Sequence, residues 1–319
     1  MIFTGQKASL FGVLSTRREA LEQENTTRKF KTFPNLKAES FQHPWDRQAI
    51  SALQAIPGFE FLVKKLMEIG FEQFFRITNL ASNIHVKGKM LPRLRESLRY
   101  ATRILDMAEP ELYITTHPLP NAFTYGETRP FIVLTSGLIE AMDEEEMFFV
   151  LAHELGHIKC GHVLYKTMAR NFKMVLDIAA GATFGMSALI STGLEMAMFD
   201  WERKSELSAD RAGMICVQNQ HIANRAFMKM AAASPKLYAE MDEGEFLRQI
   251  RSYEDAADES FINKTYTALL TSRMTHPFLI MRAKQLDSWI QGGGFSDLTG
   301  IDPMDARAEN GEFIETTGQ

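Results

Sequence analysis

The feature that most constrains the fold is a pair of histidines four residues apart, in the segment His153-Glu154-Leu155-Gly156-His157. Residues i and i+4 lie on one face of an α-helix, so both imidazoles can reach a single cation if this segment is helical. Asp143 followed by Glu146 is a capping-box start for such a helix. Apolar residues then recur at helical spacing: Met147, Val150, Leu151, Leu155 and Ile158. We therefore expect one helix that carries a metal site.

Glu154 is the residue that we expect to act as general base, because it follows the first histidine and projects beside the metal. A carboxylate in this position can take a proton from the water that zinc activates and pass it to a leaving amine. Alternatively, both histidines merely form hydrogen bonds at a helix surface, but an HExxH pattern arises by chance on the order of once in a hundred such chains. The pattern predicts one Zn²⁺ per chain and hydrolysis of peptide bonds.

A catalytic zinc site also needs a third protein ligand and an open position for water. His162 is the nearest candidate, but in a continued helix it would lie roughly 140° around the axis from His157 and point away from the metal. The pattern HExxHxxGxxH would need Gly and His where this chain has Cys160 and Val163. We therefore expect the third ligand to come from a second helix.

The segment Glu206-Leu207-Ser208-Ala209-Asp210 can supply that ligand. Glu206 can complete a His2Glu site, and Asp210, on the same face one turn later, can accept the free N–H of a liganding histidine. On its own, this segment would be interpreted as an exposed charged turn of helix. Its combination with the HExxH segment favours the metal site.

These motifs also resemble a known family. HELGHIKCGH followed by SELSADRAG is similar to the CAAX-protease/HtpX-like zinc peptidases, gluzincins whose third ligand is the Glu of an ExxxD helix. Asn121-Ala122-Phe123 followed by FIVLTSGL resembles the family's substrate-side strand, and Thr275-His276-Pro277 with Arg282 resembles its downstream segment. The similarity covers roughly residues 110–285 by motif comparison.

The resemblance implies a role for each matching residue. Its metal ligands are His153, His157 and Glu206, its catalytic acid/base is Glu154, and Asp210 supports a ligand. It further implies that His276 and Arg282 face the substrate or the oxyanion, and that Asn121, Ala122 and Phe123 contact the substrate. Family members embedded in the membrane have several spanning helices, whereas this chain has at most one short candidate.

The expected fold is α+β and predominantly helical, a gluzincin-type metallopeptidase domain with a small sheet beside the HExxH helix. Strands are predicted at Glu111–Thr115, Asn121–Tyr125 and Phe131–Thr135 from β-prone runs that flank turn residues. We divide the chain into a weakly structured extension (1–42), an N-terminal helical layer (43–108), the catalytic domain (109–290) and an acidic, disordered tail (291–319).

Charge and cysteine content narrow the partners and the compartment. The net charge is −5, and no basic stripe of the kind that binds nucleic acid is present. Two cysteines are too few for a disulfide scaffold, and the N-terminus lacks the pattern of a secretory signal. We expect a cytoplasmic protein whose partner is a polypeptide substrate.

One uncharged segment of 17 residues, Ile178–Leu194, leaves membrane contact open. Its length is at the lower limit for a spanning helix, so we favour a helix buried in the core over a segment that dips into a membrane. The whole pattern predicts a metalloendopeptidase that acts on unfolded or exposed segments. The alternatives are a non-catalytic or latent zinc-binding module that holds peptides, and a membrane-anchored quality-control protease.

Overall fold

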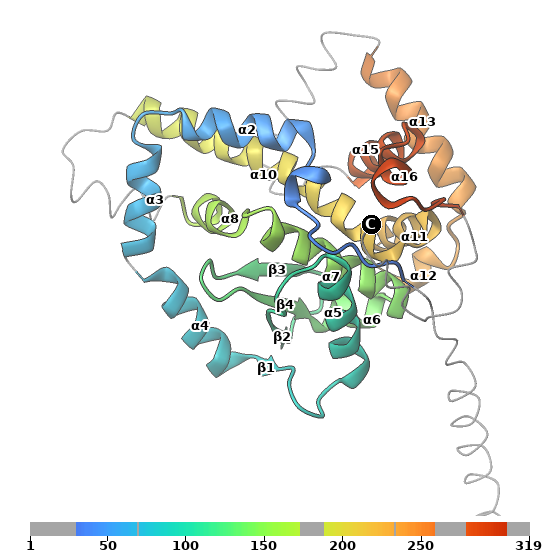
Figure 1. The fold of residues 1–319 in the computed structure, drawn as a ribbon, viewed down its shortest axis with the longest axis horizontal. Helices are drawn as coiled ribbons and strands as arrows, with labels where there is room; N and C mark the ends of the chain where they lie inside the picture. Colours follow the sequence, from blue (N-terminus) through green and yellow to red (C-terminus); the bar gives the residue numbers. More distant parts are fainter. Residues whose placement is uncertain (1–29, 69, 173–187, 233, 259–278, 305–319) are drawn as a thin grey trace, which may run out of the picture.

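A computed structural model describes residues 30–68, 70–172, 188–232, 234–258 and 279–304. Helices α7 (Glu144–Lys159) and α10 (Ala188–Val217) pack against each other at its centre (Figure 1). Small residues allow them to approach closely: a Cβ added at Gly156 would lie 2.7 Å from the Cβ of Ala212. The predicted capping box is confirmed, since the Asp143 carboxylate accepts from the backbone N–H of Glu146 and the Glu146 side chain accepts from that of Asp143.

The sheet lies beside α7 and has the strand order β1-β2-β4-β3. Strand β2 (Glu111–Thr115) runs parallel to β4 (Phe131–Thr135), while β1 (Ile84–His85) and β3 (Ala122–Tyr125) pair antiparallel to their neighbours. All five residues of β4 are buried, as expected for a strand covered on both faces. The predicted bounds of β2 and β4 are confirmed, and β3 ends the described strand order next to α7. The α+β fold class is thus confirmed.

Other helices surround this centre. Helix α2 (Pro44–Gln54) lies along α10, α5 (Pro92–Ile104) packs on α7, and α8 (Val163–Arg170) follows α7 in the chain (Figure 1). The remaining described elements are η1 (Ala38–Ser40), α3 (Phe59–Glu68), α4 (Phe71–Ser82), α6 (Ser136–Ala141), α11 (Gln220–Ala232), α12 (Pro235–Tyr238), α13 (Glu243–Asp258), α15 (Leu279–Gln291) and α16 (Gly294–Thr299).

Both ends of the described chain contribute to the core. Phe30, Leu36 and Phe41 are buried in the main apolar cluster, within the extension that we predicted to be weakly structured. The predicted disordered tail is wrong for residues 294–299, which form α16 around the fully buried Phe295. Glycine allows α16 to pack against the end of α15, because a Cβ at Gly294 would lie 2.3 Å from the indole nitrogen of Trp289. Residues 1–29 and 305–319 lie outside the described part.

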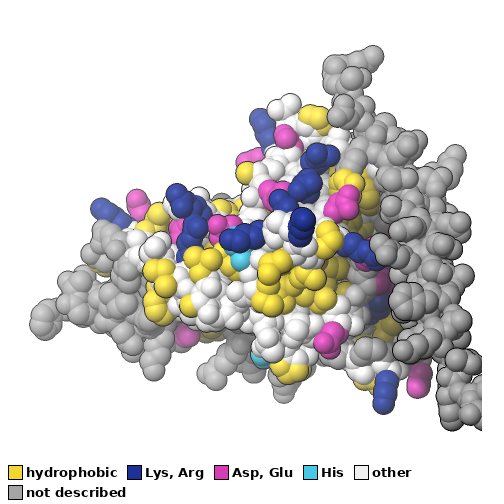
Figure 2. All heavy atoms as spheres, turned by 90° about the horizontal axis from the view of Figure 1, so that it is seen from below, with side chains coloured by type: hydrophobic (Ala, Val, Ile, Leu, Met, Phe, Trp, Pro, Cys, Tyr) yellow, Lys and Arg dark blue, Asp and Glu magenta, His cyan; other side chains and the backbone are white. Residues whose placement is uncertain are grey.

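The uncharged segment Ile178–Leu194 lies only partly within the described residues. Residues 178–187 of the uncharged segment are outside the described residues, and Ala188–Leu194 begin α10. In the described ranges, none of the helices combines the length and the apolar character needed to cross a membrane. Figure 2 shows hydrophobic side chains gathered among Lys and Arg side chains on one face, and α4 exposes Phe74, Ile77 and Leu80.

Candidate active site

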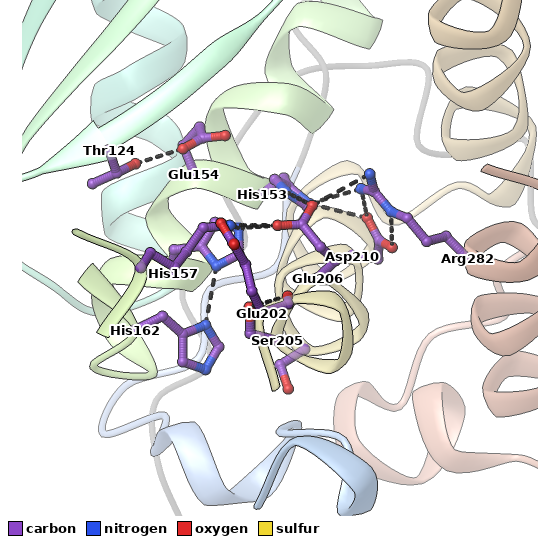
Figure 3. Close-up of polar contacts among 12 residues, drawn as sticks. Thr124, His153, Glu154, His157, His162, Glu202, Ser205, Glu206, Asp210 and Arg282 are labelled. Carbon is purple, nitrogen blue, oxygen red and sulfur yellow. Dashed lines mark hydrogen bonds and ion pairs between the residues drawn. The ribbon is translucent and has the colours of Figure 1, made fainter. Parts of the chain in front are cut away.

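Helices α7 and α10 bring together the three predicted metal ligands, His153, His157 and Glu206 (Figure 3). The Nε2 of His153 lies 3.3 Å from one carboxylate oxygen of Glu206, and the Nε2 of His157 lies 3.2 Å from the other. All three side chains are buried. Two ligands of a tetrahedral zinc ion with bonds of about 2.0–2.1 Å are roughly 3.3–3.4 Å apart. The two nitrogens and the carboxylate therefore fit zinc in both chemistry and spacing.

Lys166 of α8 places a positive charge against this donor set. Its Nζ donates to the Nε2 of His157 over 3.0 Å and also contacts the carboxylate of Glu206. Lys166 also lines the adjoining cavity. The cluster is thus electrostatically suited to a cation.

The three candidate ligands differ in their pKa values. Burial opposes the charged form of Glu206, but the charge of Lys166 and the contacts with both histidines hold its pKa well below the usual range. Burial, together with Lys166, holds the pKa of His157 well below its usual value. Burial also disfavours charge on His153, yet hydrogen bonds with Asp210 and Glu206 raise its pKa to about 9. Glu206 and His157 are therefore in the deprotonated forms that bind metals.

The second ring nitrogen of His153 is held from α10. Its Nδ1 lies 3.0 Å from Asp210, as the sequence predicted for a carboxylate one turn after Glu206. Arg282 of α15 donates to both oxygens of Asp210, over 2.9 and 2.5 Å, and lies 3.3 Å from Glu206. Arg282, which we expected to face the substrate, is 4% exposed and has these two carboxylates as partners.

The second ring nitrogen of His157 is held by a residue that we had set aside. Its Nδ1 lies 3.0 Å from the Nδ1 of His162. As predicted, His162 is not turned toward the metal side, since it contacts the ring nitrogen of His157 opposite the Nε2 that faces Glu206. The continuous helix that we assumed was wrong. Instead, α7 ends at Lys159, and the chain turns at Gly161, whose φ of +70° is in the left-handed region. This turn returns His162 to the side of His157.

A buried carboxylate far away in the sequence completes this contact. The Nε2 of His162 lies 2.9 Å from Asp46, in the first turn of α2. Asp46 is fully buried, and its pKa is lowered to about 2 because the contacts with His162 and hydrogen bonds from Ser208 and Gln42 outweigh burial. Nothing in the sequence pointed to Asp46, because an acid in the first turn of a helix is ordinary. A histidine directly after a helix-ending glycine was the available signal for His162.

Glu154 faces the sheet. Thr124 of β3 donates to its carboxylate over 2.5 Å, a contact that the sequence analysis missed (Figure 3). A cavity of about 210 Å³ opens here, and its walls include His153, Glu154, Glu206, Asn121, Ala122 and Arg282. Phe123, expected to contact substrate, is not among the wall residues of this cavity, and it packs on Tyr125 in the sheet with ring centroids 5.4 Å apart. His276 lies outside the described residues.

Comparisons with known proteins give one family. The model of "Peptidase family M48" matches residues 92–290. The plastoglobule-localized metallopeptidase 48 of Arabidopsis thaliana is 34% identical over 259 residues, which cover 81% of this chain and 74% of the relative. A protease HtpX homolog of Pelotomaculum thermopropionicum is 29% identical over 230 residues, 64% of this chain and 78% of the relative. No solved structure matches the chain significantly.

Proposed function

The chain belongs to peptidase family M48 and is a zinc metallopeptidase, and from this premise we propose that it is an endopeptidase whose general base is Glu154. The proposed metal ligands are His153, His157 and Glu206. The observation that carries the proposal is the convergence of two imidazole Nε2 atoms on the two oxygens of one buried carboxylate, with Glu154 in the wall of the same cavity. The substrates are polypeptides.

Each residue of the cavity has a separate role in the proposed hydrolysis. Zinc in this site would polarise the scissile carbonyl as a Lewis acid and lower the pKa of water. Glu154 accepts the proton of the attacking water and passes it to the leaving amine. Thr124 fixes the Glu154 carboxylate by its hydrogen bond. We assign His276 as a donor to the developing oxyanion.

Strand β3 supplies the proposed contact with substrate main chain. It ends the described strand order, and Asn121 and Ala122 line the cavity beside Glu154. An extended peptide that adds to this strand would place its backbone across the cavity. Because this mode requires an extended chain on both sides of the scissile bond, we propose unfolded or exposed segments as substrates.

The cellular location proposed is the cytoplasm, and contact of Ile178–Leu194 with a membrane is the alternative to the buried helix that we favour. A relative from Arabidopsis thaliana is named as plastoglobule-localized. Flotation of the intact protein with vesicles tests this contact. Protein that stays at the bottom of the gradient would argue against it.

The test compares wild type with Glu154→Gln and with Glu144→Gln as matched control. Glu144 is on the same helix, but its side chain is 68% exposed and pairs with Arg93. We expect about one zinc per chain in all three proteins and cleavage of casein by wild type and the control only. Internal fragments as first products indicate an endopeptidase, and release of terminal dipeptides alone would contradict that assignment. Zinc without cleavage in wild type would favour a non-catalytic or latent module.

A further inference from the structure

The two candidate histidine ligands are held in different ways. His153 contacts Asp210 directly, whereas His157 reaches a carboxylate only through a second histidine. Three residues form this second path and are 2% exposed or less: His157, His162 and Asp46. Three buried polar groups in a row need matched donors and acceptors, so their proton positions can be worked out.

Lys166 sets the direction of the path. An ammonium has only donors, and at 3.0 Å it is nearer to the Nε2 of His157 than the Glu206 oxygen is at 3.2 Å, so the shorter contact makes Nε2 an acceptor. The proton of the neutral His157 ring is then on Nδ1, which donates to the Nδ1 of His162 over 3.0 Å. His162 must therefore carry its own proton on Nε2, which donates to Asp46 over 2.9 Å.

Asp46 is surrounded by donors and can only accept. Its Oδ2 accepts from His162, from Ser208 over 2.6 Å and from Gln42 over 2.9 Å. Its Oδ1 accepts from the Trp201 indole over 3.0 Å. A carboxylate that accepts from this many groups favours its ionised form. Asp46 therefore fixes the ring tautomer of His162, and His162 in turn fixes that of His157.

We propose that Asp46 is a positioning residue for the metal centre: through His162 it holds His157 in the tautomer whose Nε2 lone pair faces Glu206. The proposal rests on the ligand role of His157 in the proposed function. It makes α2 of the N-terminal layer a part of the metal centre. Removing a group that orients a ligating histidine typically lowers metal affinity 10–100-fold.

Asp46→Asn is the most direct variant because it keeps the shape of the side chain. The amide has a single carbonyl oxygen, for which Trp201 and His162 compete. An indole N–H can only donate, whereas a histidine can exchange its tautomer. The carbonyl is therefore expected to turn to Trp201 and the NH₂ group to His162. His162 then carries its proton on Nδ1, where it faces the Nδ1–H of His157. Two donors cannot form a hydrogen bond, so the tautomer of His157 that leaves Nε2 free for the metal is no longer stabilised.

The experiment is a double-mutant cycle in the full-length protein, read out as zinc affinity in competition with a chromophoric chelator. We expect Asp46→Asn to weaken zinc binding 10–100-fold in the wild-type background. His162→Asn keeps an acceptor oxygen near His157 but breaks the path to Asp46. In that background, Asp46→Asn should cause no further loss. An equal loss in both backgrounds would show a merely structural role and overturn the proposal, as would no loss in wild type.

A second comparison covers the case in which Asp46→Asn folds poorly. His162→Asn should retain most of the zinc affinity, whereas His162→Leu, which offers no acceptor to His157, should lose 10–100-fold. Equal affinities of these two variants would contradict the path. Wild type that binds no zinc at all would instead contradict the proposed function, so the two failures are distinguishable.

Discussion

The two sides of the metal centre are supported in contrasting ways. On the His153 side, one helix supplies both the proposed ligand Glu206 and the supporting Asp210, and Arg282 pairs with both carboxylates. On the His157 side, support comes from two residues 116 positions apart, His162 and Asp46. The first side is a cluster of ion pairs in which two carboxylates of α10 meet Arg282, and the second is a path of hydrogen bonds from His157 through His162 to Asp46.

This difference has an energetic consequence. Arg282 is a permanent cation that is 4% exposed, so it depends on Asp210 and Glu206 for its charge balance. Trp201, Ser208 and Gln42 around Asp46 are neutral donors, so removing Asp46 costs them hydrogen bonds and leaves no permanent cation such as Arg282 without a partner. The His153 side should therefore be the more costly one to break.

Asp210→Ala is expected to have the largest effect on stability. It leaves the Arg282 guanidinium buried without its bidentate partner, and breaking a buried pair in this way costs about 3–5 kcal/mol. The measurement is the free energy of unfolding by denaturant, compared with Asp46→Ala. Asp200→Ala is the control, because Asp200 is on the same helix but half exposed, and should stay within about 0.5 kcal/mol. A greater loss for Asp46→Ala than for Asp210→Ala would reverse the comparison.

Acid should weaken the His157 side through Asp46. Its pKa is lowered from 3.8 to about 2, so the folded protein binds fewer protons there than the unfolded chain. Its contribution is complete above pH 3.8 and is lost as the pH falls toward 2, on the order of 2 kcal/mol. Unfolding of wild type and Asp46→Asn between pH 5 and 2.5 checks this. Parallel stability curves would remove Asp46 as a source of acid sensitivity.

Alkaline pH should act on the other side in protein stripped of zinc. The pKa of His153 is raised to about 9 by Asp210 and Glu206, so the folded state binds the extra proton. This contribution is complete below pH 6.5 and is lost as the pH rises through about 9. Chelator-treated protein should therefore melt at a lower temperature at pH 9.5 than at pH 6.5. In His153→Gln the melting temperature should change less between pH 6.5 and 9.5. An unchanged difference in that variant would show that His153 is not the titrating group.

The smallest expected effect concerns the turn that returns His162 to the site. No described atom lies within 4 Å of a Cβ added at Gly161, so Gly161→Ala tests backbone strain alone at φ +70°. We expect a loss of about 1 kcal/mol from the left-handed conformation. Gly193→Ala is the matched control within α10, where the same change should stabilise by about 0.5–1 kcal/mol. Destabilisation of similar size at both positions would contradict this account of the turn.

The difference between the His153 side and the His157 side also explains which contacts could be predicted from the sequence. Pairs within one helix, such as His153 with His157 or Glu206 with Asp210, follow from the helical repeat. The spacing of apolar residues and the capping box gave α7, and β-prone runs gave β2 and β4. Contacts between distant elements have no such repeat.

Four residues were therefore not located by the repeats of helices and strands. Asp46 and Thr124 approach the centre only because α2 packs on α10 and β3 lies beside α7. The place of His162 depended on one left-handed glycine rather than on helical geometry. The buried Phe295 lies in a glycine-rich, acidic stretch whose composition is typical of disorder.

X-ray absorption at the zinc edge of the purified protein tests the central claim most directly, because it reports the ligand atoms themselves. We predict two imidazole nitrogens and a carboxylate oxygen at about 2.0–2.2 Å. The outer-shell scattering should be that of two histidine rings, with no sulfur. In Glu206→Gln, zinc should be lost or its coordination changed. A zinc–sulfur distance of about 2.3 Å, or the signature of a single histidine, would contradict the assignment of His153, His157 and Glu206.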